Sequence, residues 1–353
     1  MSPLDLPATP VFDGHNDTLL KLEIAERKGF ELDFATGAPE IDIDLPRARE
    51  AGFAGGLWAM YTPSRVAEID RPYDRRDPRN FGSVERATAL DFTLAMFARL
   101  RRLARALPLD LAICSDVADV RRAMASGQIA VWPHIEGAEC IDTDFHALEV
   151  LHAAGLRSLG PVWSRPNVFG HGAPMVRRPE IEPGEGLTEA GRALVQACEA
   201  LGIVVDCAHL TEQGFWDVAE VSERPLIVSH SNAHALSPNA RNLSDRQLAA
   251  VAERQGLVGL NFHVCFLRED CALDRDTPLT QMIRHLDHLI EHVGEDGVAL
   301  GSDFDGCELP REIGDVTGLP RLVAAMRQAG YGEALVEKLC WRNWLCALER
   351  ATA

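Results

Sequence analysis

Eight apolar runs, separated by helical segments or loops, constrain the fold of this chain more than any other feature. The runs are predicted to be β-strands at residues 11–18, 52–60, 128–137, 156–163, 203–209, 225–231, 257–262 and 298–306. Strands that alternate with helices pair in parallel through right-handed crossovers. Eight of them close most economically into an α/β barrel of the (β/α)8, TIM type, and a chain of 353 residues suits one such catalytic domain, residues 1–353, with loop insertions.

Helical segments lie between the predicted strands. Apolar residues at three- and four-residue spacing predict a long outer helix over 84–107, and Ser244 is an N-cap residue for a helix that runs to Arg254. Further helices are predicted at 19–27, 117–124, 147–154, 187–201, 212–221, 279–293, 319–329 and 332–350, with a short extra strand within 113–126. The stretches at about 30–46, 61–80 and 166–186 are predicted to be loops, and long loops on compact domains are often functional.

Polar residues stand at the carboxyl ends of several predicted strands. Side chains two apart on a strand point to one face, so His15 and Asp17 can hold one ion between them. Such a pair often arises by chance, but later strand ends offer the partners that it needs: Glu136, His209, His230 and Asp303. Because catalytic residues of barrel enzymes sit at the C-terminal ends of the strands, we expect these six side chains to converge.

The residue types in this set favour metal-dependent hydrolysis. Three imidazoles with carboxylates suit zinc, although cobalt or manganese could occupy the same ligands, and a single ion rarely needs so many of them. Two ions bridged by Glu136 would use all of them, because Glu136 comes from a strand between the two pairs. A hydroxide shared by two ions is a nucleophile at neutral pH, and the ions polarise a carbonyl. Asp303 then serves as general base and general acid.

Other histidines and an aspartate have simpler interpretations. Asp206 is expected to cap a helix or to support a ligand, and His134 to have a structural or supporting role. The remaining histidines near helices are assigned to surfaces or packing: His146, His152, His285, His288 and His292.

Charge, cysteine content and the lack of a targeting segment indicate the surroundings in which the protein works. A net charge of -18 and a pI near 5.1 argue against nucleic acid and anionic membranes, which select basic surfaces. Nine cysteines without a Cys-x-x-Cys pair fit reduced thiols buried as small hydrophobes. No signal peptide or membrane-spanning run is visible, so a cytoplasmic protein is expected.

Six motifs together resemble the membrane (renal) dipeptidase family, in its bacterial branch, within the amidohydrolase superfamily. They are Gly14-His15-Asn16-Asp17, Ile135-Glu136-Gly137, Asp206-x-x-His209, Ser229-His230-Ser231-Asn232, Arg241-Asn242 and Gly301-Ser302-Asp303-Phe304-Asp305-Gly306. The resemblance implies a binuclear zinc site with His15 and Asp17 on one ion, His209 and His230 on the other, and Glu136 bridging. It also implies a homodimer, and Arg241, next to Asn242, as the residue that binds the C-terminal carboxylate of a dipeptide. A guanidinium fork suits that role because it pairs with a carboxylate through two hydrogen bonds.

Two positions depart from the animal members of that family. Trp163 stands where they have a substrate-contacting histidine, and His263 stands where they have a tyrosine. We expect Trp163 and Asn242 to contact substrate. His263, His171 or His234 would supply the missing polar contact, and the sequence leaves the choice among these three open.

Three functions follow from this set of residues. The first is a di-zinc dipeptidase that accepts L-Xaa-D-Xaa substrates such as L-Ala-D-Ala, through an open pocket for the C-terminal side chain. The second is another amidohydrolase, a lactonase or cyclic-amide hydrolase. Many of those bridge their metals with a carboxylated lysine, whereas Lys21, Lys28 and Lys338 lie outside every predicted strand. The third is a non-catalytic binding protein, which would be expected to lose some of the six residues.

Overall fold

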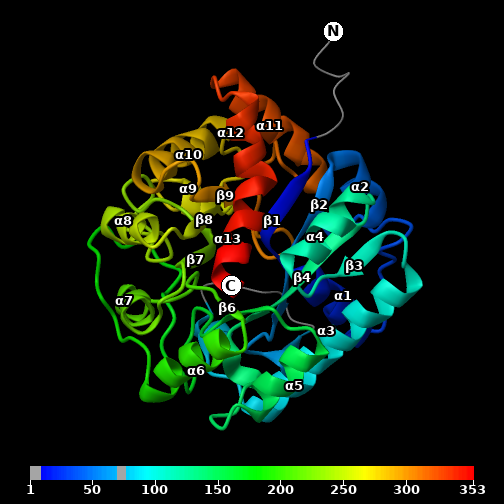
Figure 1. Cartoon of the computed structure of the whole chain (residues 1–353), viewed down its shortest axis with the longest axis vertical. Coiled ribbons are helices and arrows are strands. Elements are labelled where there is room, and N and C mark those ends of the chain that lie inside the picture. The colour runs from blue at the N-terminus through cyan, green and yellow to red at the C-terminus, as the bar shows by residue number, and fades with distance from the viewer. Residues whose placement is uncertain (1–8, 70–76) are drawn as a thin grey trace.

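The computed structural model describes residues 9–69 and 77–353, and it confirms the predicted parallel barrel (Figure 1). Residues 70–76, which belong to the predicted insertion at 61–80, lie outside the described residues. The strands are β1 (Val11–Asn16), β2 (Phe53–Tyr61), β3 (Leu111–Ile113), β4 (Ile129–Glu136), β5 (Ser158–Gly160), β6 (Val204–Val205), β7 (Ile227–Ser231), β8 (Leu257–Leu260) and β9 (Val298–Leu300).

Two parallel sheets and two bridges close the barrel. One sheet has the order β1-β2-β4-β5-β6 and the other β7-β8-β9. A parallel bridge from Asp206 to Ile227 joins β6 to β7, and one from Asn16 to Phe304 joins β1 to the segment after β9. The extra strand predicted within 113–126 is β3, which lies slightly earlier, at Leu111–Ile113. It pairs with the first half of β4, while β5 pairs with the second half. The eight strands are therefore adjacent in chain order around the barrel, apart from this short insertion.

The helices surround the strands (Figure 1). They are α1 (Thr18–Arg27), α2 (Leu45–Ala51), α3 (Arg86–Ala106), α4 (Val117–Ala125), α5 (His146–Ala154), α6 (Glu189–Ala200), α7 (Glu212–Val221), α8 (Asp245–Glu253), α9 (Val264–Leu267), α10 (Leu279–Val293), α11 (Leu319–Gln328), α12 (Glu333–Glu337) and α13 (Asn343–Thr352). The bounds of α7 and α10 are those predicted, and Ser244 caps α8 through a capping box with Gln247.

The structure corrects the sequence prediction in several places, among them the short helix α9, which lies in a predicted loop. The short helix α2 begins at Leu45, at the end of the segment predicted to be irregular, because Asp44 caps it and Pro46 lies in its first turn, where a missing N–H is harmless. The single helix predicted at 332–350 is divided into α12 and α13 by a π-helical turn, Lys338–Arg342. In α13, Asn343 Nδ2 donates to Val298 O and Trp344 Nε1 donates to Leu300 O, so the helix is held against β9.

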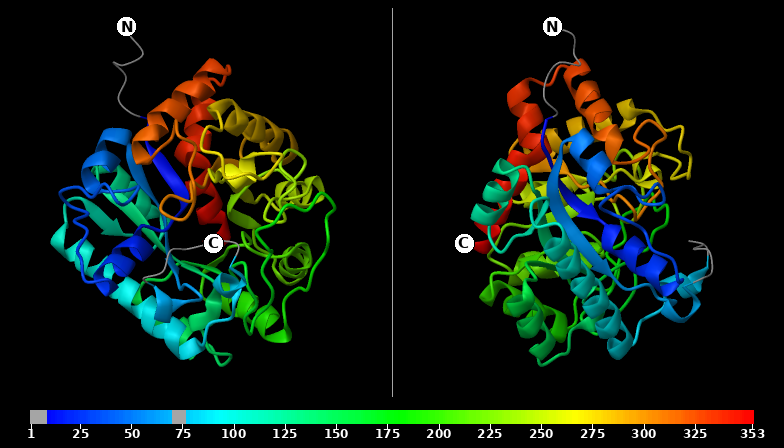
Figure 2. Two further views of the ribbon diagram at one scale, coloured as in Figure 1. Left: turned by 180° about the vertical axis from the view of Figure 1, so that it is seen from behind. Right: turned by 90° about the vertical axis from the view of Figure 1, so that its right-hand side faces the viewer.

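Helix α13 closes one end of the barrel. Trp344, Leu345 and Leu348 form a buried cluster with strand residues that include Phe12 and Trp132. Figure 1 shows α13 crossing in front of the strands, and the side view in Figure 2 places it along one face of the molecule. The opposite ends of the strands therefore remain available for a functional site.

Two further observations concern membrane-spanning helices and the exposure of the cysteines. Across residues 9–69 and 77–353, no helix combines the length and the apolar character needed to span a bilayer. Of the cysteines, seven are buried, Cys307 is half-buried and Cys346 is exposed.

Candidate metal centre

The candidate site begins at the end of β1. His15 lies within the strand, and Asp17 stands at the N-terminus of α1. Gly14 allows β1 to pack closely, because a Cβ atom there would overlap the carbonyl oxygen of Ser229 and lie 2.5 Å from Trp344 Cζ2. The close approach of β1 to β7 brings His15 to His230, with 4.0 Å between the ring centroids.

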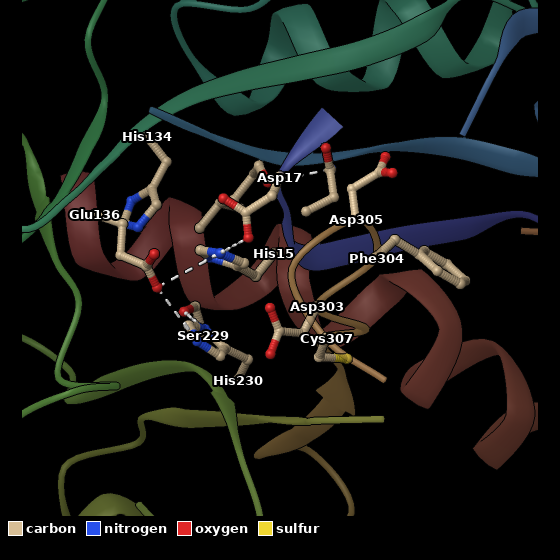
Figure 3. Close-up of polar contacts among 12 residues, drawn as sticks. His15, Asp17, His134, Glu136, Ser229, His230, Asp303, Phe304, Asp305 and Cys307 are labelled. Atoms are coloured by element: carbon tan, nitrogen blue, oxygen red, sulfur yellow. Dashed lines mark hydrogen bonds and ion pairs between the residues drawn. The ribbon is translucent and has the colours of Figure 1, made fainter. Parts of the chain in front are cut away.

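The predicted ligands converge on the carboxylate of Glu136, the last residue of β4. Its Oε1 lies 2.8 Å from His209 Nε2 and 3.5 Å from the Nε2 atoms of both His15 and His230. His15 Nε2 also lies 3.4 Å from Asp17 Oδ2. Figure 3 shows the Glu136 carboxylate pointing toward His15 and His230. The structure thus brings the five predicted ligands together in the barrel, and all five side chains are buried.

Hydrogen bonds behind His230 set its tautomer. Ser229 Oγ donates to Asp206 Oδ2 at 2.5 Å and lies 2.7 Å from His230 Nδ1. Since the single hydroxyl proton is directed to Asp206, the hydroxyl oxygen accepts from His230 Nδ1–H, and His230 Nε2 carries a lone pair. That Nε2 lies 3.1 Å from His209 Nε2. His209 Nδ1 is in turn 2.8 Å from the hydroxyl of Ser164.

This arrangement of charges and lone pairs fits a bound cation. Burial lowers the pKa values of His209 and His230 well below the usual range, so both rings are neutral at pH 7. Burial also raises the pKa of Glu136 to about 8, opposed by the charge of His15 and reinforced by that of Asp17. Lone pairs that face one another around a buried carboxylate are unfavourable without a positive charge between them.

Two overlapping groups of side chains could each hold an ion. In His15–Glu136–His230 and in His15–Asp17–Asp303, the ligand atoms all lie within 4.8 Å of one another. Among the described residues, His15 Nδ1, His15 Nε2 and Asp17 Oδ1 are buried without a hydrogen-bond partner. Unpaired buried donors and acceptors are rare in proteins. The nitrogen and carboxylate atoms present therefore fit divalent transition metal ions.

Asp303 lies beside this cluster in a strained turn. Its backbone φ angle is 63°, in the left-handed region that residues other than glycine seldom adopt. Its backbone N donates to His15 O at 3.0 Å, and Asn261 Nδ2 donates to its Oδ2 at 3.0 Å. Burial raises the pKa of Asp303 to about 6. The carboxylate is thus held in one orientation, with Oδ2 occupied by Asn261.

Gly306 ends the same turn. A Cβ atom at this position would overlap both Asp17 Oδ2 and Asp303 Oδ1. The absence of a side chain is therefore required for the two carboxylates to occupy their places.

A cavity of about 880 Å³ adjoins the cluster, a size typical of small-molecule sites. Asp17, Glu136, His209 and Asp303 contribute to its lining. Apolar side chains and cations also line it, among them Leu20, Ile24, Met175, Phe266, Lys21, Arg65 and Arg275. The cavity thus joins the candidate metal ligands to a mixed apolar and polar surface.

Arg241 is buried near the ligand cluster, behind His230 and outside the cavity lining. Its Nη2 donates to His230 O at 3.4 Å, its Cζ lies 5.6 Å from the centre of the Phe266 ring, and its Nε has no hydrogen-bond partner among the described residues. Burial lowers the pKa of Arg241 to about 10, opposed by the charges of Glu136 and Asp303. A buried guanidinium with an unused donor is suited to binding an anion.

The other predicted substrate residues fall into two groups. Trp163 and His263 line the cavity. The lining does not include Asn242, whose Nδ2 donates to Ser237 O and Phe266 O, or His234, whose Nε2 lies 2.7 Å from Arg178 O. His171 also lies outside it, with Nε2 2.8 Å from Glu185. Of the three histidines considered for the missing polar contact, His263 alone is placed at the cavity.

The structure also shows supporting residues that the sequence did not single out. Ser229 and Ser164 contact the ring nitrogens of two predicted ligands, and Asn261 holds Asp303. Behind Trp163, the buried Arg165 pairs with Glu139 at 2.7 Å and donates to Thr62 O. The sequence offered two weak signals, the place of Ser229 in the motif around His230 and that of Asn261 at the end of a predicted strand.

His134 and Asp206 lie behind the ligands. His134 Nε2 is 3.5 Å from Asp206 Oδ2, and its Nδ1 is 3.0 Å from Ser158 Oγ. Asp206 accepts from the backbone N and the hydroxyl of Ser229. Both residues thus occupy supporting positions.

Comparison with known proteins identifies similar chains. Residues 6–353 match the family model of membrane dipeptidase, peptidase family M19. An uncharacterised Klebsiella pneumoniae protein from the region 5′ of pqqA is 47% identical over 239 residues, which are 68% of this chain and 88% of that protein.

Two solved structures are similar over nearly their whole length. One is a dipeptidase and metallo peptidase of family M19, and the other is a metallo peptidase from Rhodobacter sphaeroides liganded with a phosphinate mimic of the dipeptide L-Ala-D-Ala. Each is 47% identical, with a TM-score of 0.88, and the alignment covers 98% of this chain and 99% of the other.

Proposed function

The chain belongs to the membrane dipeptidase family, peptidase family M19, and we propose that this metallo-dipeptidase uses two zinc ions to hydrolyse dipeptides, including L-Xaa-D-Xaa substrates such as L-Ala-D-Ala. One observation carries the proposal. Three imidazole Nε2 atoms lie within 3.5 Å of the single oxygen Glu136 Oε1, and two of those nitrogens lie 3.1 Å apart. Such a concentration of metal-ligating atoms supports a bound cation.

Each residue near the metals has a separate role in this proposal. His15 and Asp17 would hold one ion, His209 and His230 the other, and Glu136 would lie between the two. When bound, the ions acidify water and polarise the carbonyl of the scissile amide. The two zinc ions are favoured over harder cations because imidazole nitrogen is the most frequent donor in the set.

Asp303 would move the proton that hydrolysis requires. Its Oδ2 accepts from Asn261, so Oδ1 is the atom that takes a proton from the attacking water and gives it to the amine nitrogen that leaves. The fixed turn around Asp303 keeps its carboxylate beside His15 and Asp17. A carboxylate held in place in this way lowers the entropic part of the barrier.

Arg241 would bind the C-terminal carboxylate of the dipeptide. Its buried guanidinium and unpartnered Nε support this role, because a carboxylate would restore the charge balance and the hydrogen bond. An amide at the same place would leave the guanidinium uncompensated. Selection for free dipeptides over longer peptides would follow.

The cavity supports acceptance of a D-residue at the C-terminal position. A D-residue directs its side chain to the opposite side of the peptide plane, which requires open space. The 880 Å³ cavity offers that space beside Trp163 and His263. The relative from Rhodobacter sphaeroides, liganded with a mimic of L-Ala-D-Ala, supports the same substrate class.

We further propose that the protein is a cytoplasmic homodimer. The nine cysteines, all free and seven of them buried, support a reducing compartment. Light scattering on purified protein at several concentrations would test the dimer, and fractionation of cells would test the compartment.

The decisive experiment measures amine release from L,L and L,D dipeptides, each with a C-terminally amidated twin, by enzyme of known metal content. Asp303→Asn is the test variant and Asp91→Asn, at an exposed aspartate, is its control. We expect free dipeptides to be cleaved, amides to be poor substrates, and Asp303→Asn to lose about 100-fold or more in kcat while it retains both metals.

Two results would contradict the proposal. Metal-loaded enzyme that cleaves no dipeptide but opens lactones or cyclic amides would favour the other amidohydrolase function. Full activity in Asp303→Asn would remove Asp303 from the proton transfer.

A further inference from the structure

A second group of potential metal ligands lies on the outside of the barrel, between helices α8 and α10. His288 and His292 stand one turn apart on α10, and Asp245 is the first residue of α8. His288 Nε2 lies 2.7 Å from Asp245 Oδ1, and His292 Nε2 lies 3.6 Å from Asp245 Oδ2. Figure 1 shows the two helices as neighbours at the outer edge of the molecule.

We propose that Asp245, His288 and His292 form a surface site for a divalent transition metal ion of the zinc class, separate from the barrel centre. The ligand atoms of the three residues all lie within 4.8 Å of one another. The sequence alone placed both histidines on a helix surface with no further role.

The two histidines are neighbours on one face of α10, and rotation of one ring would bring both Nε2 atoms to a single ion. Residues four apart lie on one face of a helix, the spacing by which pairs of helical histidines bind zinc. Their rings are stacked, with centroids 4.2 Å apart and 18° between the planes. His292 Nδ1 lies 2.9 Å from the carbonyl oxygen of His288 and can only donate to it, so the Nε2 atom of neutral His292 has a free lone pair.

The third ligand is fixed from the other helix. Ser244 caps α8 through a capping box with Gln247, which places Asp245 in an ordered first turn. On α10, one turn before His288, the buried His285 bonds to Leu267 O and to the backbone N of Ala233. Because both helices are anchored at the site, ion binding would order little additional structure, which favours affinity.

The donor set and its exposure select the class of ion. Two imidazoles and one carboxylate match zinc, nickel or copper better than magnesium or calcium, which prefer oxygen ligands. The side chains are 17%, 26% and 50% exposed for His288, His292 and Asp245, so water can complete the coordination. The net charge of -18 concentrates cations around the protein.

Binding would replace the contact between His288 and Asp245. A zinc ion would take the place of the proton that joins these residues at 2.7 Å and would also engage His292. The ion would thereby link α8 to α10.

A matched comparison exists elsewhere on the surface. Asp142, Asp144 and His146 also place three potential ligand atoms within 4.8 Å, but they include a single imidazole. His146 is 82% exposed, and its Nδ1 lies 3.6 Å from Asp142. We expect this group to bind zinc much more weakly than Asp245, His288 and His292 do. His146→Asn therefore serves as the control that detects non-specific binding of zinc to exposed histidines.

The test counts zinc on enzyme whose barrel centre has already been loaded. Equilibrium dialysis against increasing zinc should show one further equivalent on the wild-type protein and on His146→Asn. The variants His288→Asn and His292→Asn should each lose at least about tenfold in affinity for that equivalent. Mutation of a residue that only supports a metal ligand already causes a loss of that size. Dipeptide hydrolysis should be the same in all four proteins.

A spectroscopic measurement identifies the ligands directly. Copper added to the zinc-loaded enzyme should give an electron paramagnetic resonance spectrum with two coordinated imidazole nitrogens, and Tm should rise with the concentration of added ion. A further equivalent that survives in the double variant His288→Asn/His292→Asn, or one that His146→Asn removes, would overturn the proposal. Folding of each variant is checked by its Tm without added metal.

Discussion

Asp206 reaches His230 through one hydroxyl group, that of Ser229, which donates to Asp206 Oδ2 at 2.5 Å and lies 2.7 Å from His230 Nδ1. The carboxylate comes from the segment after β6, and the serine and histidine come from β7. The chain of hydrogen bonds directs the lone pair of His230 Nε2 toward Glu136. Residues that form a hydrogen bond with the other ring nitrogen of a metal-binding histidine raise its basicity and hold its ring in place.

Ser229→Ala should therefore weaken metal binding at His230. Without the hydroxyl, His230 can adopt the tautomer whose Nε2 is protonated, and we expect a loss of about 10- to 100-fold in affinity for one of the ions. Activity should return when excess zinc is added. Zinc content and activity against zinc concentration provide the measurement, with Ser237→Ala as the control, since Ser237 bonds to Arg268 O instead. An unchanged zinc affinity would contradict the role given to this hydroxyl.

Gly306→Ala should disrupt the site while the barrel persists. The added methyl group would overlap the carboxylates of Asp17 and Asp303 and displace at least one of them. We expect activity to fall by about 100-fold or more, because a displacement of about 1 Å in a catalytic group has that effect. The control is Gly332→Ala, where a methyl group meets no atom of the described residues within 4 Å. Equal activity in the two variants would show that the close approach is unimportant.

Arg241→Lys should reduce the preference for a free C-terminal carboxylate. The lysine keeps the positive charge but loses the guanidinium fork, and charged hydrogen bonds contribute about 1.5–3 kcal/mol, a factor of about 10 to 150 in kcat/KM. The loss should appear with free dipeptides and be absent with their amides. Arg246→Lys is the control, because that guanidinium lies over the Trp216 ring. A similar loss with both substrate types would exclude carboxylate recognition.

Protein stability should depend on pH through His285. Burial lowers the pKa of His285 to about 4, below the value near 6.5 in the unfolded chain. The unfolded state thus binds more protons between these values, so the free energy of unfolding falls as pH falls from about 6.5 to about 4. Between pH 7 and pH 5 this group should contribute a loss of about 2 kcal/mol.

His285→Gln should remove that part of the pH dependence. Urea unfolding at pH 7 and pH 5 should show a difference about 2 kcal/mol smaller in this variant than in the wild type, because glutamine does not titrate in this range. The exposed control His146→Gln should retain the wild-type difference. If His285→Gln also retains it, the pKa of His285 is not lowered by folding.

The sequence was sufficient to predict the barrel because the strands are apolar runs bounded by turn residues, and their order follows from parallel pairing. Helix α2 was not predicted, since Pro46 was interpreted as a sign of irregular chain although proline is compatible with a first helical turn. The π-helical turn before α13 has no marker in the sequence. It accompanies the anchoring of Asn343 and Trp344 to β9, which is a tertiary effect.

The residues of the candidate site were predictable to different degrees. Histidines and carboxylates at strand ends are chemically distinctive, and the structure brings His15, Asp17, Glu136, His209 and His230 together. Their hydroxyl partners could not be foreseen, because serine is common and its partner comes from another strand. Contacts made by loops could not be predicted from the sequence either. The roles of Asn242, His171 and His234 remain predictions, and all three lie outside the cavity lining.

The parallel bridge between Asn16 and Phe304 joins the first strand of the barrel to the segment that follows the last. Chain synthesis proceeds at about 5–20 residues per second, so His15 and Asp17 leave the ribosome long before Asp303 is made. The five proposed ligands are made before that segment, but the bridge that closes the barrel beside His15 cannot form until Phe304 has been added. A chain that stops before residue 303 would therefore carry all five ligands and lack the closure that holds β1 in place.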